Sequence, residues 1–183
     1  PKWFYKNPPL TNEDNFDQEP WSFGHKYEVI SRKFIEMRYR LLPYIYTTFW
    51  HYSRFGTPMM RPLSFIEQGN AQTHSRNEEF MFGDSLLISP VIKEHQLEKS
   101  VYLPEGEWYF NWNSDRYTGG GEVTIPTPLD QIPVFIRAGA VVPTYPKIQY
   151  VGEKQIRQIT LYVYFKDGKW TSEMYEDAGD NFG

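Results

Sequence analysis

Apolar residues in the first third of the chain recur at helical spacing. Ile30, Phe34, Met37, Leu41 and Ile45 follow one another at steps of four, three, four and four, which is typical of one face of an amphipathic helix. A proline at position 43 removes a backbone donor and clashes with the preceding turn, so we expect a break near position 42. A glycine at 56 and a proline at 58 are a stop signal for the helix.

From residue 58 to about 146 the pattern changes to short apolar runs separated by turn residues. The runs cover residues 80–82, 86–91, 101–103, 107–110, 123–125 and 134–136. Runs of this length, spaced by Gly, Pro, Asn and Asp, predict an antiparallel β-sandwich or barrel. The three consecutive glycines at 119–121 predict a turn, since no helix pattern follows that would make them a phosphate cradle.

The last segment, from residue 147 onward, looks like the beginning of another β unit. Residues 159–165 predict a strand, 166–169 a hairpin turn and 170–176 a return strand. Because a two-stranded hairpin alone is marginal, we expect it either to pack on the preceding sheets or to pair with strands beyond residue 183.

Composition narrows the classes of function. The 183 residues carry a net charge of −4 and contain 6 Trp, 14 Tyr and 13 Phe, so the chain has the residues for a large core and is not of the disordered type. The negative charge argues against a nucleic-acid partner, and no apolar run is long enough to predict a membrane span. The absence of cysteine excludes disulfides and thiolate sites. It leaves the location open, with cytoplasmic and secreted or periplasmic settings both compatible.

Carboxylates are the first candidates for acid–base chemistry, and each group has a plainer interpretation. Glu13, Asp14, Asp17 and Glu19 fall in a polar loop, where solvated acids are usual. Glu78 and Glu79 precede an apolar run and are expected to be solvated or gatekeeping charges. Asp177 and Asp180 resemble half of a calcium loop, but the later bidentate Glu is missing, which favours a capped turn. The four histidines lie far apart, so we expect no metal site and no cofactor.

Aromatic side chains cluster in one of the predicted strands and just after it. The cluster consists of Trp108, Tyr109, Phe110, Trp112 and Tyr117. Exposed rings on a sheet could stack on sugars, as in a carbohydrate-binding module, but rings also fill sandwich cores and domain interfaces. We favour the core.

Several longer strings are more specific than these patterns. They are Asp17-Gln-Glu-Pro-Trp21-Ser-Phe-Gly24, Arg38-Tyr-Arg-Leu-Leu-Pro-Tyr-Ile-Tyr46, Gly56-Thr-Pro-Met-Met-Arg-Pro-Leu63, Glu79-Phe-Met-Phe-Gly-Asp-Ser-Leu-Leu-Ile-Ser-Pro-Val91, Val101-Tyr-Leu-Pro-Glu-Gly-Glu-Trp-Tyr109 and Ile132-Pro-Val-Phe-Ile-Arg-Ala-Gly-Ala-Val-Val-Pro143. In this order and at these separations, they resemble the C-terminal third of family 31 glycoside hydrolases, especially microbial α-glucosidases. The resemblance extends over about residues 3–183.

The resemblance implies an α+β fold in three parts. Residues 1–57 would be the last strand and helix of a catalytic (β/α)8 barrel. Residues 58–146 would form the proximal C-terminal antiparallel β-sandwich, and residues 147–183 the first strands of a distal β domain. The partner of this chain would then be the upstream part of the barrel.

The resemblance also implies an activity and shows what this chain lacks. Family members of this kind are retaining, exo-acting α-glucosidases that release terminal glucose from α-glucoside oligosaccharides, using a pair of Asp residues. Both lie upstream in the family, so no catalytic residue is expected in this chain, which would support the barrel. The alternative is a stand-alone carbohydrate-binding or scaffold module without hydrolase activity.

One stretch matches the sugar-contacting end of the last barrel strand. Lys6 and Asn7 correspond to the Arg-Asn of the family's Phe-x-Arg-Asn-His pattern and are the candidate substrate-binding residues. Pro8 stands where the family has the His that reaches a sugar hydroxyl. The side chain of proline has no hydrogen-bonding group, so either Pro8 replaces the His and this contact is missing, or the alignment with the family is shifted within this loop.

Overall fold

The computed structural model describes residues 19–177 and 179 and divides the chain into two compact units, residues 1–37 and 38–183. In the first unit, a short 3₁₀ helix η2 (Pro20–Phe23) leads through Gly24 into α1 (His25–Arg40), whose last three residues are counted with the second unit. Arg32 donates to the Glu28 carboxylate one turn earlier at 2.7 Å. The predicted stripe residues Ile30, Phe34 and Met37 are half-buried, and no residue of α1 is fully buried.

The predicted break in the helix is confirmed. α1 ends at Arg40, and α2 (Leu42–Phe55) begins after Leu41, which has φ −79° and ψ 1°. Pro43 lies in the first turn of α2, where its missing N–H costs no helical hydrogen bond. The helix ends as predicted at Gly56, whose φ of 70° suits glycine and whose N–H donates to the Tyr52 carbonyl.

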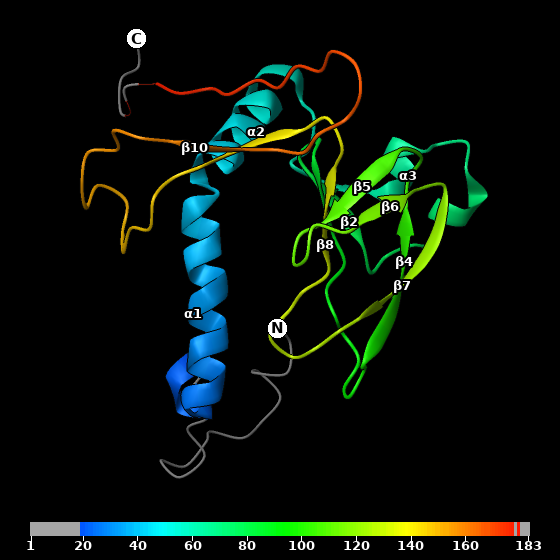
Figure 1. The fold of residues 1–183 in the computed structure, drawn as a ribbon, viewed down its shortest axis with the longest axis horizontal. Coiled ribbons are helices and arrows are strands. Elements are labelled where there is room, and N and C mark those ends of the chain that lie inside the picture. The colour runs from blue at the N-terminus through cyan, green and yellow to red at the C-terminus, as the bar shows by residue number, and fades with distance from the viewer. Residues whose placement is uncertain (1–18, 178, 180–183) are drawn as a thin grey trace, which may run out of the picture. The chain divides into compact units, whose positions relative to one another are not determined.

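The second unit is built on a six-stranded antiparallel sheet of order β1-β2-β3-β8-β5-β6. Its strands are β1 (Met60–Pro62), β2 (Phe80–Phe82), β3 (Leu86–Ile88), β8 (Val134–Arg137), β5 (Glu107–Phe110) and β6 (Arg116–Thr118). Strands β2, β5, β6 and β8 are labelled in Figure 1. A second sheet pairs β4 (Glu98–Leu103) with β7 (Gly121–Pro126), and a third pairs β9 (Val141–Thr144) with β10 (Thr160–Val163). Two short helical segments, α3 (Leu63–Ile66) and η3 (Ala71–Thr73), follow β1.

Two clusters of buried apolar side chains hold the β4–β7 pair and helix α2 against the six-stranded sheet. One cluster joins Val101, Leu103 and Ile125 of the β4–β7 pair to Trp108 and Phe135 of the main sheet, as in a sandwich. A second cluster joins α2 to the strands of the main sheet and to β9, through Tyr44, Leu86, Val134, Ile136 and Val142. The main sheet therefore has apolar cover on both faces, and the expected α+β class is confirmed.

Every predicted run in the middle of the chain overlaps a strand, but the predicted C-terminal hairpin is wrong. β10 pairs antiparallel with β9, with Thr160 opposite Thr144 and Val163 opposite Val141. Residues 170–176 form no strand. The backbone N–H and C=O groups of β9 pair with those of β10. Residues 170–176 are instead held by side-chain contacts, including the Ser172 hydroxyl, which accepts from Val141 N at 3.0 Å.

Candidate functional site

The residues predicted to contact substrate cannot be placed in the fold. Lys6 and Asn7 lie outside the described residues, as do Pro8 and three of the four loop acids, Glu13, Asp14 and Asp17. Glu19, the fourth, is exposed and its carboxylate accepts from the Ser22 hydroxyl. The candidate site must therefore be sought among the described polar clusters and cavities.

The aromatic cluster belongs to the core, as favoured, and the sugar-platform interpretation is wrong for its central members. Trp108 is fully buried, and its indole N–H donates to the Pro104 carbonyl at 2.8 Å. Tyr109 and Phe110 are buried as well. Trp112 is half-buried, packs against the first core cluster and donates to the Ile132 carbonyl at 2.7 Å. These rings are occupied by protein contacts that leave little face for a ligand.

Glu79 is not the solvated charge that its sequence predicts. Its side chain is almost fully buried, and its carboxylate accepts from Tyr102 N at 3.2 Å and from the Ser89 hydroxyl at 3.3 Å. Burial raises the pKa of Glu79 above its ordinary value, although these bonds and the nearby Arg76 oppose the rise. Ser89 follows β3 and Tyr102 belongs to β4, so burial of this carboxylate could not be read from the local pattern.

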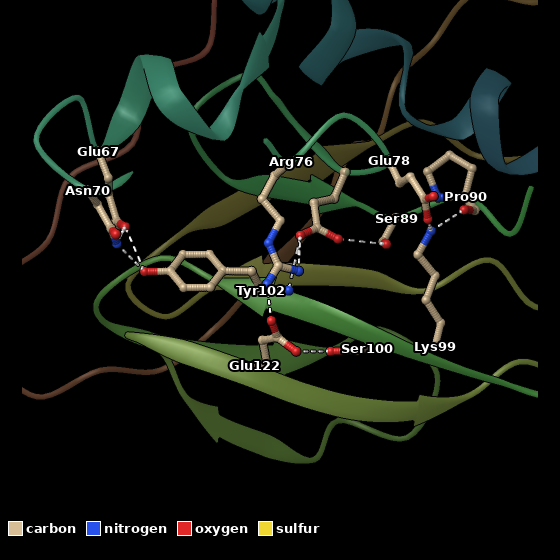
Figure 2. A network of polar contacts seen from close by, with 11 residues as sticks. Glu67, Asn70, Arg76, Glu78, Ser89, Pro90, Lys99, Ser100, Tyr102 and Glu122 are labelled. Carbon is tan, nitrogen blue, oxygen red and sulfur yellow. Dashed lines mark hydrogen bonds and ion pairs between the residues drawn. The ribbon is translucent and has the colours of Figure 1, made fainter. Parts of the chain in front are cut away.

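Arg76 connects Glu79 to a second carboxylate, that of Glu122. Figure 2 shows the Arg76 side chain pointing toward Glu122. Its guanidinium contacts Glu79 at 3.3 Å, forms an ion pair with Glu122 and lies 5.4 Å from the centre of the Tyr102 ring. The hydrogen bond from Ser100 and then the bond from Arg76 lower the pKa of Glu122. One cation thus holds two acidic groups from different segments, the loop before β2 and strand β7.

Two further contacts extend this polar network on either side (Figure 2). The buried Lys99 ammonium pairs with Glu78 at 3.0 Å and donates to the Pro90 carbonyl at 2.7 Å. Tyr102 donates its hydroxyl proton to Glu67 at 2.9 Å. The network borders a cavity of about 830 Å³. Since its carboxylates are bound to protein donors, it holds β4 and β7 to the loop before β2 and offers no free acid–base pair.

A second cavity, of about 680 Å³, lies beside α2. Its wall includes Arg61 of β1 and Asp84 in the β2–β3 turn, which form an ion pair with 2.6 Å between Nη2 and Oδ1. Tyr44 of α2 fixes that turn, because its hydroxyl donates to the Phe82 carbonyl at 2.7 Å and accepts from Ser85 N at 3.1 Å. Burial raises the pKa of Tyr44 to about 12.

Asp177 forms a capped turn, the interpretation that its sequence favoured. Its carboxylate accepts from the Tyr46 hydroxyl at 2.6 Å, the Tyr175 hydroxyl at 3.1 Å and Gly179 N at 3.0 Å. Its possible calcium partner Asp180 lies outside the described residues. Within residues 19–177 and 179, no three His, Asp or Glu side chains are grouped to hold a metal ion, and no helix has the length and apolar character to cross a membrane.

The acidic and aromatic patterns of the sequence do not point to four charged residues of these clusters, Arg61, Asp84, Arg76 and Lys99. Arg61 and Asp84 fall inside two of the strings that carry the family resemblance, 56–63 and 79–91, which was the available signal. Arg76 and Lys99 stand alone in polar surroundings, and only the fold brings them to their carboxylates.

Comparison with known proteins identifies two adjoining family regions. Residues 8–48 match the TIM-barrel domain of glycosyl hydrolases family 31, and residues 56–142 match the C-terminal domain of the same family. An alpha-xylosidase of Saccharolobus solfataricus is 39% identical over 90% of this chain and 22% of its own length. Alpha-glucosidase 2 of Bacillus thermoamyloliquefaciens is 34% identical over 90% of this chain and 21% of its own length.

Solved structures agree with these relatives. The dextranase of Flavobacterium johnsoniae, complexed with isomaltotriose, superposes with a TM-score of 0.81 at 38% identity, over 84% of this chain and 19% of that protein. The cycloalternan-forming enzyme of Listeria monocytogenes, in complex with a pentasaccharide substrate, has a TM-score of 0.77 at 30% identity, over 85% of this chain and 16% of that protein. The chain thus spans about a fifth of the length of its relatives.

Proposed function

Because the chain belongs to glycosyl hydrolase family 31 and comprises the end of its barrel domain followed by its C-terminal domain, we propose that it is the C-terminal portion of a retaining, exo-acting α-glucosidase. The complete protein would release terminal α-linked glucose from oligosaccharides. The substrate class would be α-glucosides, acted on by the complete protein.

The adjacency of the two family regions carries this proposal. A barrel-domain match that ends at residue 48 and a C-terminal-domain match that begins at residue 56 reproduce the order of an α-glycosidase in one continuous chain. Relatives named as alpha-glucosidase and alpha-xylosidase align over 90% of the chain. The choice of glucose over xylose rests on the Gln18-Glu-Pro-Trp21 form of the barrel segment.

The contribution of this chain would be structural. Residues 1–57 would close the catalytic barrel, 58–146 would form the supporting sandwich and 147–183 would begin a distal β domain. Retaining hydrolysis needs two carboxylic groups about 5 Å apart that face the sugar. Glu79 is buried, and both Glu79 and Glu122 are tied to Arg76, which fits a catalytic Asp pair located in the upstream barrel. Lys6 and Asn7 would contact the sugar.

Hydrolysis by the complete protein, as its native source produces it, tests the proposal. We expect glucose release from p-nitrophenyl α-glucoside to exceed xylose release from the matching α-xyloside, with α-glucose as the first product by NMR. The isolated 183-residue chain should release neither sugar. Xylose release alone would contradict the substrate, and β-glucose as first product would contradict the retaining mechanism.

The intact mass of the native protein separates this proposal from the stand-alone module. A mass several times 21.8 kDa would leave room for a whole barrel of about 250 residues. A mass near 21.8 kDa would leave no barrel and would overturn the hydrolase proposal.

A further inference from the structure

The turn that follows β10 contains the only Asp-Gly pair of the sequence. The pair is Asp167-Gly168, and the chain has no Asn-Gly pair. Both residues are exposed, and Gly168 has a φ of +100°, a conformation that suits glycine. We propose that Asp167 is a site of spontaneous covalent modification, at which its peptide link to Gly168 isomerises to isoaspartate.

The reaction needs these two residues and water. The Gly168 nitrogen attacks the side-chain carboxyl carbon of Asp167, and the new C–N bond closes a succinimide ring as one water leaves, made from the amide hydrogen and the carboxyl OH. Water then opens the ring. Cleavage of the bond between the nitrogen and the side-chain carbonyl restores aspartate, whereas cleavage at the main-chain carbonyl gives isoaspartate, in which the chain runs through the side chain. One water is lost and one is gained, so nothing is oxidised or reduced.

The fold leaves both reacting groups available. Among the residues that the structure describes, none bonds to the Asp167 carboxylate, and the Gly168 N–H donates to none. Glycine has no side chain to obstruct the attacking nitrogen, and ring closure within one chain needs no encounter. The Asp167 carbonyl accepts from the Trp170 indole N–H at 2.9 Å. This bond draws electrons from the peptide unit and favours loss of the Gly168 proton.

Three other aspartates of the structure lack this combination. Asp84 is paired with a buried guanidinium, and Asp177 accepts from two tyrosine hydroxyls. Asp115 is exposed, but it accepts from the Asn113 amide at 2.6 Å and is followed by an arginine, whose side chain hinders the adjacent nitrogen. A carboxylate held by a donor must give up that bond before it approaches the backbone. The reaction is therefore expected at Asp167.

Isomerisation at this position would alter the turn that holds Trp170. The indole ring packs on Gly139, where a Cβ would lie 2.8 Å from the ring atom Cδ2, and Lys166 Nζ lies 4.3 Å from the ring centre. Isoaspartate adds a methylene to the main chain before Gly168. It also makes the carbonyl that accepts from Trp170 part of a free carboxylate. The modification would thus loosen the beginning of the segment that side chains hold to β9 and α2.

Incubation of the 183-residue chain for several weeks at physiological temperature and neutral pH tests the proposal. Cleavage after glutamate yields the peptide 154–173. Isoaspartate in this peptide is recognised by its chromatographic shift and by resistance to a protease that cleaves before aspartate. We expect the isomer to accumulate several times faster than any isomer at Asp115, accompanied by a trace of peptide that is one water lighter.

Two variants of the same residue sharpen the test. Asp167→Glu keeps the charge but would need a larger ring, so the peptide should stay unchanged. Asp167→Asn closes the same succinimide with loss of ammonia and should convert several times faster than the wild type. Isomer formation no faster at Asp167 than at Asp115 would overturn the proposal, as would an Asp167→Asn variant that stays intact.

The Trp170 indole N–H reports the structural consequence. In the isomerised protein, we expect this proton to exchange with solvent several times faster, because its acceptor is displaced. Unchanged exchange in NMR spectra would overturn the link between the modification and the turn. The proposal goes beyond the proposed hydrolase function, because the reaction involves no sugar and can fail while the complete protein still hydrolyses glucosides.

Discussion

β8 and β10 are both apolar strands of four residues, yet they have opposite environments. In β8, Val134, Phe135 and Ile136 are buried, whereas every residue of β10 is exposed. β8 pairs with β3 on one side and β5 on the other, and apolar clusters cover both its faces. β10 pairs with β9, and no other pairing of β10 occurs among the described residues. An apolar sequence is therefore enough for a strand to pair, but its burial depends on layers supplied by other parts of the protein.

The contrast between β8 and β10 predicts the largest difference in stability between two alanine variants. Phe135→Ala would leave a cavity in the first core cluster and should lower the free energy of unfolding by about 3–5 kcal/mol. Leu161→Ala on β10, where the side chain is 58% exposed, should change it by no more than about 0.5 kcal/mol. Urea denaturation of both variants and the wild type measures the difference. Equal losses would mean that β10 is covered in solution.

Close packing also restricts the backbone at some positions, and substitutions of two nearby glycines, Gly119 and Gly121, can test this. A Cβ on Gly119 would lie 1.9 Å from the Pro104 carbonyl oxygen, whereas a Cβ on Gly121 would have no atom within 4 Å. Gly119→Ala should therefore cost about 1–3 kcal/mol or more, while Gly121→Ala should be nearly neutral. Thermal melting of the two variants compares them. Similar melting temperatures would contradict the close approach of residue 119 to Pro104.

Local sequence patterns were sufficient to predict the two helices and the positions of the strands in the middle of the chain. The helix stripe, Pro43 and Gly56 predicted α1, the break and the end of α2 because each acts within one or two turns of backbone. The six apolar runs likewise marked strands. The partner of β10 was not predictable in this way, since its pairing with β9 depends on a connection of residues 145–159 that brings distant backbone groups together.

The polar sites were less predictable than the elements. Glu79 stands beside Glu78 in the sequence, and an acidic pair normally indicates solvent. Its burial is made possible by Arg76, Ser89 and the Tyr102 N–H, which belong to separate segments. The same holds for Arg61 and Asp84, whose strings identified the family without indicating that the two side chains meet.

The buried network should respond to pH in a way that distinguishes its two carboxylates. Burial raises the pKa of Glu79 in the folded protein, so its contribution to stability is present below the unfolded-state pKa and is lost as the pH rises through the folded-state pKa. In the Glu79→Gln variant this side chain is neutral at every pH. We therefore expect the stability of the variant relative to the wild type to increase as the pH rises from about 3 to about 7.

Glu122→Gln should show the opposite trend. Bonds from Ser100 and Arg76 lower the pKa of Glu122, so its contribution is present above the unfolded-state pKa and is lost as the pH falls through the folded-state pKa. The stability of this variant relative to the wild type should therefore worsen as the pH rises over the same range. Urea denaturation at several pH values measures both, and parallel trends in the two variants would contradict the assignment of Glu79 as the buried member of the pair.

The smallest effect concerns the segment that follows β10. Residues 173–177 are held to α2 by the Tyr46 hydroxyl, which donates to Asp177 at 2.6 Å, and by Trp50, whose ring stacks on Tyr175 with 4.9 Å between centroids. Tyr46→Phe removes the hydrogen bond and keeps the ring, so we expect the amide of Gly179, which donates to the same carboxylate, to exchange with solvent a few times faster. Amides of β8 should keep their rates, because that strand is buried between two layers. Hydrogen exchange followed by NMR measures both regions at once. Unchanged exchange at Gly179 would mean that stacking on Trp50 holds the segment without help from Tyr46, and faster exchange in β8 would mean that the two regions unfold as one.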